Sequence, residues 1–118
     1  MKWLRKAAEQ DHTNAQTMLG MAYDEGIGEL SQDYKEAAKW YKKAAAQESA
    51  EAQLRISLLF AQGKGVIKDY VQAHMWVNLA ASNGRKDAPE LRNIYEKKMT
   101  PQQIAKAQEM ARNWKPKK

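Results

Sequence analysis

The stretch Trp40-Tyr41-Lys42-Lys43-Ala44-Ala45 decides how this chain folds, because related stretches occur twice more. Trp76-Val77-Asn78-Leu79-Ala80-Ala81 repeats its tryptophan and its paired alanines, and Trp3-Leu4-Arg5-Lys6-Ala7-Ala8 does so near the start of the chain. The three tryptophans, at positions 3, 40 and 76, are 37 and 36 residues apart. A fixed period of this size is typical of helical repeat proteins, so the chain is predicted to be an array of similar units.

A second set of residues recurs in the same register. Most of its members are offset by 37 residues, and those after the glycine pair by 36, so one loop is a residue longer than the other. The matched pairs are Ala15 with Ala52, Leu19 with Ile56, Tyr23 with Phe60, Gly26-Ile27-Gly28 with Gly63-Lys64-Gly65, Asp33 with Asp69, and Ala37 with Ala73.

Each unit is predicted to contain two helices, because its apolar residues recur at helical spacing. The glycine pairs should end the first helix in the left-handed conformation that glycine adopts easily. Asp33 and Asp69 should cap the second helix, with Glu36 and Gln72 closing a capping box three residues later. The alanines of the second helices leave room into which large side chains of neighbouring helices can pack.

Three further helix starts can be predicted. Thr13 with Gln16 resembles a capping box, and Ser49 is placed to cap the first helix of the next unit. Thr100-Pro101-Gln102-Gln103 combines a cap, a proline in the first turn and a glutamine at the third helical position. The last helix should therefore run from this point to about Trp114.

Composition excludes several classes of function. The chain has 118 residues, a formal net charge of +6 and no cysteine, so it has neither disulfides nor thiolate chemistry. Two isolated histidines, His12 and His74, cannot form a metal centre alone, and we expect no metal or cofactor. His74 corresponds to Ala38 of the preceding unit, which predicts a surface position. No apolar stretch approaches the roughly 20 residues of a membrane span.

The sequence offers no catalytic constellation. The Gly-x-Gly pairs follow helices and lack the lysine and hydroxyl residue of a phosphate-binding loop, so they are interpreted as turns. Asp24 and Glu25 are adjacent and diverge on a helix, and the next unit has Ala61 and Gln62 in their place. No nucleophile, base and orienting group recur at a shared spacing. We therefore predict that the protein is not an enzyme.

The positive charge leaves two interpretations open. Lys35, Lys39, Lys42 and Lys43 lie in one predicted helix, and three more lysines lie in the tail 115–118. Lysines along a helix usually form a solvated face, but they can also bind an anionic polymer or surface such as nucleic acid, polysaccharide or lipid headgroups. No dense stripe of arginine and aromatic residues is present, which disfavours nucleic acid.

These residues resemble the Sel-one-like repeats, a family related to the tetratricopeptide repeats. The family pattern is approximately A-x-x-x-L-G-x-x-Y-x-x-G-x-G-V, a short loop, and D-x-x-x-A-x-x-W-Y-x-K-A-A. The first full unit carries it at Ala15, Leu19-Gly20, Tyr23, Gly26, Gly28, Asp33, Ala37, Trp40-Tyr41 and Lys43-Ala44-Ala45; the second has Ile56-Ser57 for Leu-Gly, Phe60 for Tyr and Val77 for the second aromatic. The resemblance implies an all-α, right-handed α/α solenoid with a C-terminal capping helix.

On this basis the chain divides into five parts. Residues 1–12 form a truncated second helix of a preceding repeat, 13–48 and 49–84 are repeats, 85–114 are a helical cap, and 115–118 are a basic tail. The missing start of the first helix suggests that the natural protein extends further, or that Met1 is an artificial start. The resemblance favours a periplasmic or secreted protein and leaves a cytoplasmic one possible.

The resemblance also implies where a partner binds, because in related solenoids the first helix of each pair lines a concave groove. Apolar groove positions would be Met21, Leu54, Leu58 and Ile94, and polar ones Asn14, Thr17, Asp24, Glu25, Glu51, Gln62 and Glu90. The leading hypothesis is a monomeric, non-enzymatic scaffold that binds a protein or peptide there and has no small-molecule substrate. The alternative is an anionic polymer bound by the lysine-rich faces.

Overall fold

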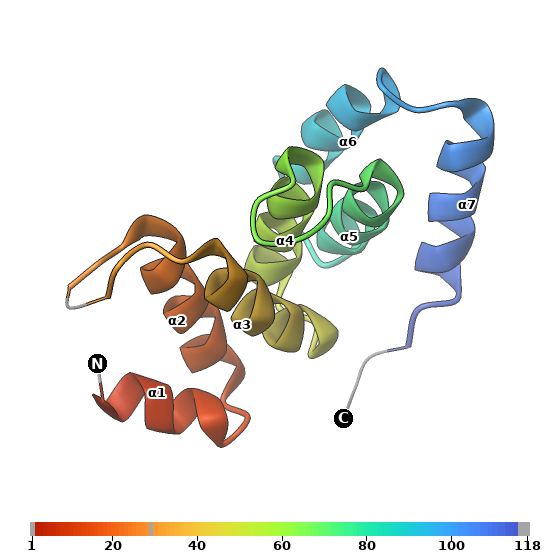
Figure 1. Ribbon diagram of the computed structural model, residues 1–118. Helices are drawn as coiled ribbons and strands as arrows, with labels where there is room; N and C mark the ends of the chain where they lie inside the picture. The colour runs from red at the N-terminus through yellow and green to blue at the C-terminus, as the bar shows by residue number, and fades with distance from the viewer. Residues whose placement is uncertain (1, 29, 116–118) are drawn as a thin grey trace.

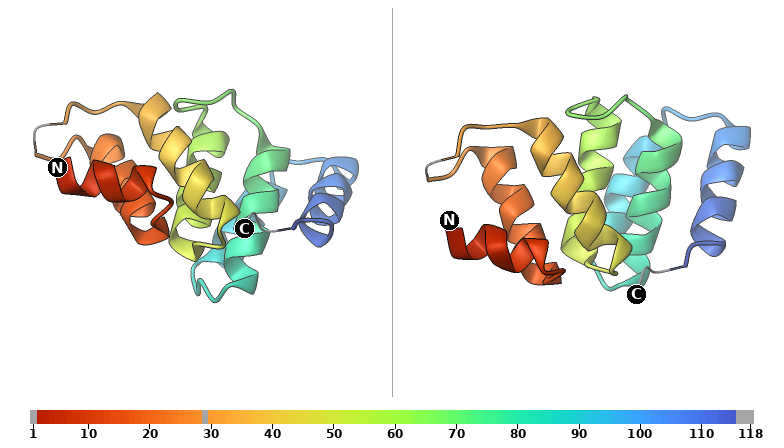
Figure 2. Two further views of the ribbon diagram at one scale, coloured as in Figure 1. Left: turned by 90° about the horizontal axis from the view of Figure 1, so that it is seen from below. Right: turned by 60° about the horizontal axis from the view of Figure 1, so that its bottom comes forward.

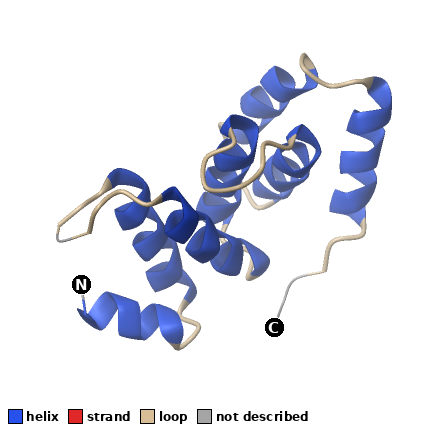
Figure 3. Cartoon of the chain, viewed as in Figure 1, coloured by secondary structure: helices blue, strands red, loops and turns tan. Residues whose placement is uncertain are grey.

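The computed structural model describes residues 2–28 and 30–115, which contain seven helices and no strand (Figure 3). The helices are α1 (Lys2–Glu9), α2 (Thr13–Glu25), α3 (Tyr34–Ala46), α4 (Ala50–Gln62), α5 (Tyr70–Ser82), α6 (Ala88–Glu96) and α7 (Pro101–Arg112). Helices α1 to α5 follow one another along the long axis of a molecule measuring 45 × 28 × 23 Å, and α6 and α7 lie on either side of α5 (Figures 1 and 2). The all-α helical repeat solenoid is therefore confirmed.

The helices pair as the repeat predicts, except at the C-terminal end. Helices α2 and α3 pack against each other, as do α4 and α5, and the two pairs join through α3 and α4. Helix α6 packs on α5, and α7 also packs on α5 instead of pairing with α6 (Figure 2). The third pair is therefore open, with α5 between its two helices.

The predicted caps of the second helices are confirmed, but without the reciprocal half of a capping box. The Asp33 and Asp69 side chains accept hydrogen bonds from the backbone N–H groups of the second and third residues of α3 and α5. Their own N–H groups donate to the carbonyls of Tyr23 and Phe60, at 2.9 and 3.0 Å, in the preceding helix. This contact occupies the donors that Glu36 and Gln72 were predicted to bind. Thr100 and Gln103 do form a complete capping box.

The prediction that Thr13 caps α2 is wrong. The cap is His12, whose Nδ1 accepts from the Ala15 N–H at 3.2 Å. Gln16 instead turns inward, is fully buried, and donates to the Ala8 carbonyl at 3.1 Å. Gln53 repeats this bond with the Ala45 carbonyl at the same distance. These two glutamines are 37 residues apart in the sequence, the spacing of the repeat. That spacing is the sequence signal for this buried hydrogen bond between consecutive repeats.

Alanine acts as the spacer of the core, as predicted. Trp40 and Tyr41 are almost completely buried, and so are Leu19, Ile56 and Val77 from the neighbouring helices. Close approach of the helices requires small residues where they cross, because protein interiors are close-packed. The second-helix alanines with no exposed surface are Ala37, Ala44, Ala45, Ala73 and Ala80, whereas Ala81 is partly exposed.

Departures of the second unit from the family pattern compensate one another. A Cβ at Gly20 would lie 2.6 Å from the Tyr41 ring, so the Leu-Gly pair of the first unit makes room for this tyrosine. The second unit has Ser57 at the glycine position and the smaller Val77 at the tyrosine position. Ser57 is buried and its hydroxyl lies 3.2 Å from the Tyr95 hydroxyl, whose pKa is raised to about 12 by burial. In the second unit, Ser57 is larger than glycine, and Val77 is correspondingly smaller than tyrosine.

Trp114 closes the C-terminal end over the two repeats. Its ring packs edge-on against Trp76, with ring centroids 4.9 Å apart. Its indole N–H donates to Glu48 Oε1 at 2.9 Å, in the turn between α3 and α4. The other Glu48 oxygen accepts from Asn83 at 2.8 Å, so one carboxylate joins the turns that follow α3 and α5 to the segment after α7.

Candidate functional site

An apolar cleft lies between α4 and α6. This apolar cleft, as we call it, has a volume of about 270 Å³. It is lined by Leu54, Leu58, Asp87, Glu90, Leu91 and Ile94. Leu54 and Leu58 are one turn apart on α4, and Glu90 and Ile94 are one turn apart on α6. Ile94 is 49% exposed, so the cleft has an uncovered wall that another apolar side chain can contact.

The predicted groove residues divide between this cleft and other positions. Leu54, Leu58, Glu90 and Ile94 come together in it. Met21 does not line it and packs against the core from α2. Asn14 is exposed near the start of α2, and Gln62 is exposed at the end of α4. Leu91 and Asp87 were missed, because the third unit is shifted from the repeat register at Leu91.

Thr17 does not project into a groove, contrary to the prediction. It is buried, and its hydroxyl lies 3.1 Å from the Ser49 hydroxyl and 3.2 Å from the Thr13 carbonyl. Ser49 is the cap of α4, so this hydrogen bond belongs to the contact between the two repeats. Thr17 therefore joins α2 to the start of α4.

Three of the four predicted acidic residues form ion pairs or hydrogen bonds, some within a repeat and some between repeats. Glu25 and Glu51 both approach Arg55, at 3.6 and 2.9 Å, and Glu51 also pairs with Arg85 at 3.1 Å. Asp24 accepts from the Tyr41 hydroxyl at 2.9 Å. Burial, followed by the charge of Asp24, raises the pKa of Tyr41, so this phenol remains a donor.

Charge separates between the two kinds of helix. The first helices α2, α4 and α6 carry five carboxylates and two arginines, a net charge of −3. Helix α3 alone carries four lysines and one glutamate, a net charge of +3. Three of these lysines also lie over rings: Lys39 and Lys43 over Trp40, and Lys42 over Phe60. The charged residues in the lining of the apolar cleft are both acidic, Asp87 and Glu90.

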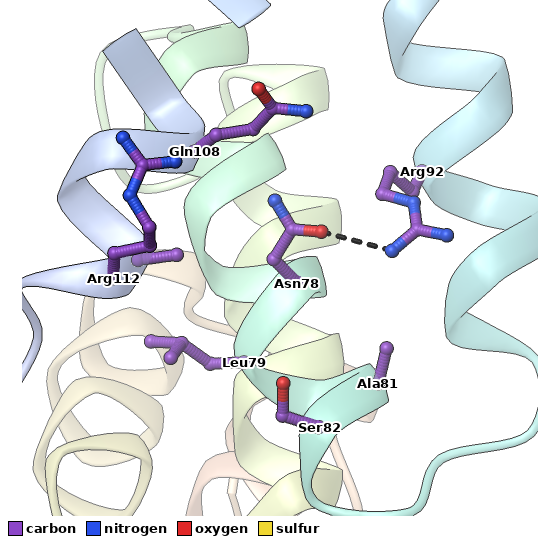
Figure 4. A pocket seen from close by; sticks show the side chains of 8 residues that line it. Asn78, Leu79, Ala81, Ser82, Arg92, Gln108 and Arg112 are labelled. Carbon is purple, nitrogen blue, oxygen red and sulfur yellow. Dashed lines mark hydrogen bonds between the residues drawn. The ribbon is translucent and has the colours of Figure 1, made fainter. Parts of the chain in front are cut away.

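A second, larger cleft lies where the third helix pair is open. It has a volume of about 650 Å³ and is lined by Asn78, Leu79, Ala81, Ser82, Arg92, Gln108, Ala111 and Arg112. We call it the arginine cleft. Figure 4 shows Arg92 reaching Asn78 from α6, while Gln108 and Arg112 stand on the opposite wall, on α7. Helix α5 forms the floor between them.

A partly buried chain of hydrogen bonds holds one wall of this cleft. It includes His74, for which the sequence predicted a surface position. His74 is 0% exposed, and its Nε2 lies 2.7 Å from Glu96 Oε2. The Asn78 oxygen accepts from Arg92 at 3.0 Å, which directs the Asn78 amide nitrogen toward His74 Nδ1, also at 3.0 Å. His74 therefore carries its proton on Nε2 and donates it to Glu96. The corresponding Ala38 is buried too, so the comparison with it did not indicate exposure.

Two observations on the described residues concern metal binding and general-base chemistry. Within residues 2–28 and 30–115, no three His, Asp or Glu side chains are placed to hold a metal ion together. Both ring nitrogens of His74 are engaged by Glu96 and Asn78, which leaves neither to activate a nucleophile.

The sequence profile of the Sel1 repeat matches residues 1–12, 13–49 and 50–84. The chain belongs to the Sel1 repeat family. Members of this family are generally protein-interaction modules and typically non-catalytic scaffolds. No curated protein matches the chain.

The solved structures that match this chain include two with the same repeat. One is a protective antigen present in uropathogenic Escherichia coli strains, described as displaying an SLR fold, with 38% identity, a TM-score of 0.91 and 96% of this chain covered. The other is a Sel1 repeat protein from Oxalobacter formigenes, with 43% identity, a TM-score of 0.74 and 77% of this chain covered. The matches cover 24% and 26% of those chains, so this Sel1 repeat chain spans about a quarter of their length. In the part of the chain that the structure describes, no helix is both long and apolar enough to cross a membrane.

Proposed function

We propose that this Sel1 repeat chain is a non-enzymatic scaffold that binds a segment of a partner protein in the apolar cleft between α4 and α6. The observation that carries the proposal is the pairing of equivalent positions from successive units in one cleft, Leu58 with Ile94 and Leu54 with Glu90. Solenoids use such rows of equivalent positions on successive repeats as extended binding surfaces.

The size of the cleft supports a side chain as its occupant. Sites for small molecules usually measure about 300–1,000 Å³. The apolar cleft, at about 270 Å³, lies below this range. An aliphatic or aromatic side chain that projects from a partner can fill it, and such anchors carry most of the binding energy of protein interfaces.

The charge around the cleft supports a basic partner segment. Glu90 and Asp87 lie in its lining, and the first helices carry a net charge of −3. Arg85 donates to Asp87, and this hydrogen bond lowers the pKa of the Asp87 carboxyl, which stays ionised. Glu90 makes no ion pair within the described part of the chain and can meet a lysine or arginine. The expected ligand is an apolar anchor next to basic residues.

Selection from a random peptide library against the full chain tests this proposal. We expect the selected peptides to combine an aliphatic or aromatic residue with lysine or arginine. Leu58→Glu should weaken their binding at least about tenfold, because it places a carboxylate in the apolar cleft. Ile94→Glu, at a half-exposed position, should do the same. The matched control is Ile67→Glu, at a residue that is 89% exposed in the loop before α5.

Two results would contradict the proposal. The first is unchanged affinity in both Leu58→Glu and Ile94→Glu variants that remain folded. The second is selection of acidic peptides whose affinity falls steeply with salt and depends on the lysines of α3. That result would assign binding to the lysine-rich face and support the anionic-ligand alternative.

A further inference from the structure

We infer that the arginine cleft is a second binding site, which takes an oxyanion, a carboxylate or phosphate group, on a small organic molecule or at the C-terminus of a peptide. The cleft exists because α7 packs on α5 and leaves α6 without a paired helix. Its volume of about 650 Å³ lies within the range of small-ligand sites. It is lined by different residues from the apolar cleft.

The charge of its lining indicates an anion. Arg92 and Arg112 line opposite walls, and no carboxylate is among the lining residues. Glu96, one turn from Arg92, lies against His74. Among the described residues, Arg55 and Arg85 pair with carboxylates, whereas neither cleft arginine lies within 4.0 Å of one. A guanidinium presents planar donors that match the oxygens of a carboxylate or phosphate.

Arg92 is also held in place before any ligand arrives. One of its terminal nitrogens donates to Asn78 Oδ1 at 3.0 Å, and Asn78 is itself fixed by buried His74. A guanidinium has five N–H donors, so this bond leaves others for a ligand. Holding a donor in position reduces the conformational entropy lost on binding.

The rest of the lining indicates an organic anion. Ser82 and Gln108 provide neutral hydrogen-bonding groups near the two arginines. Leu79, Ala81 and Ala111 provide aliphatic surface on the floor and on the α7 wall. A ligand with an anionic group and a short apolar body can contact all three kinds of group.

Calorimetric titration of the full chain tests the site with three probes: inorganic phosphate, N-acetyl-Ala-Leu with a free carboxylate, and the same dipeptide as its amide. We expect saturable binding of phosphate, of the free acid, or of both, and none of the amide. Arg112→Gln should weaken it about tenfold, because it removes one charge-assisted contact. Lys106→Gln removes the same charge from an exposed position of α7 outside the cleft and should change affinity less than twofold.

The probes separate the two sources of the anion. Stronger binding of phosphate supports a small-molecule oxyanion, and stronger binding of the dipeptide acid supports a peptide C-terminus. Arg92→Gln, with its fold checked by circular dichroism, should show a loss comparable to that of Arg112→Gln. The inference is overturned if neither anion binds at millimolar concentrations, if the amide binds as well as the acid, or if Arg112→Gln behaves like Lys106→Gln.

Discussion

Gly65→Ala is expected to lower the free energy of unfolding by about 3–5 kcal/mol. Gly65 has φ +74°, which costs an alanine energy in any surroundings. Its position adds a clash, because a Cβ there would lie 2.2 Å from the Tyr34 carbonyl oxygen and 2.8 Å from the Lys35 nitrogen. These backbone atoms begin α3 of the preceding repeat, so the glycine turn of one unit packs against the helix start of another. Urea unfolding followed by circular dichroism measures the loss.

Gly84→Ala separates the backbone contribution from the clash. Gly84 also has a positive φ, of +96°, but a Cβ there would meet nothing within 4 Å. We expect a loss of about 1–2 kcal/mol, from backbone strain alone. Equal losses in the two variants would contradict the close packing of the Gly63–Gly65 turn on α3.

Trp40→Ala is expected to lower the free energy of unfolding by about 3–5 kcal/mol, the usual cost of truncating a buried aromatic residue. Trp40 is 2% exposed and lies in α3, which packs against both α2 and α4. Lys39 and Lys43 hold their charged groups 5.0 and 4.9 Å from its ring and would lose this contact as well. Trp40→Phe should keep most of the stability and gives a measurable value if Trp40→Ala is unfolded at equilibrium.

Trp3→Ala is the matched control, because Trp3 occupies the same repeat position in α1. Trp3 is 70% exposed, whereas Trp40 is buried. Its removal should cost less than about 0.5 kcal/mol. A loss at Trp3 as large as that at Trp40 would contradict a core that buries Trp40 and leaves Trp3 outside.

The fold could be predicted from the sequence because the repeat signals depend on local physics. Asp33, Asp69, Gly26 and Gly63 act within one or two turns of themselves, so their spacing alone predicts where helices start and end. The recurring alanines indicate close helix crossings in the same direct way. The separation of α6 and α7 could not be predicted. It depends on α7 packing against α5, and a helix cap gives no information about which helix its own helix will contact.

The sites were less predictable because they depend on contacts between units. Leu58 and Ile94 could be placed by register, and the structure brings them together. Thr17 occupies the register of Leu54 and Glu90 but bonds to Ser49. A hydroxyl in a sequence does not show whether its partner is water or another repeat. His74 was misplaced for a similar reason, since Glu96 and Asn78 make its burial possible. The arginine cleft joins Arg92 and Arg112 across two helices that no repeat register relates.

Mapping of backbone amide shifts by NMR during titration with a library-selected peptide tests the central claim most directly, namely that the first helices bind a partner segment. We predict shifts concentrated at Leu54–Leu58 of α4 and Glu90–Ile94 of α6, with the lysine-bearing residues of α3 unchanged. Shifts concentrated on α3 between Lys35 and Lys43, with α4 and α6 unchanged, would contradict it.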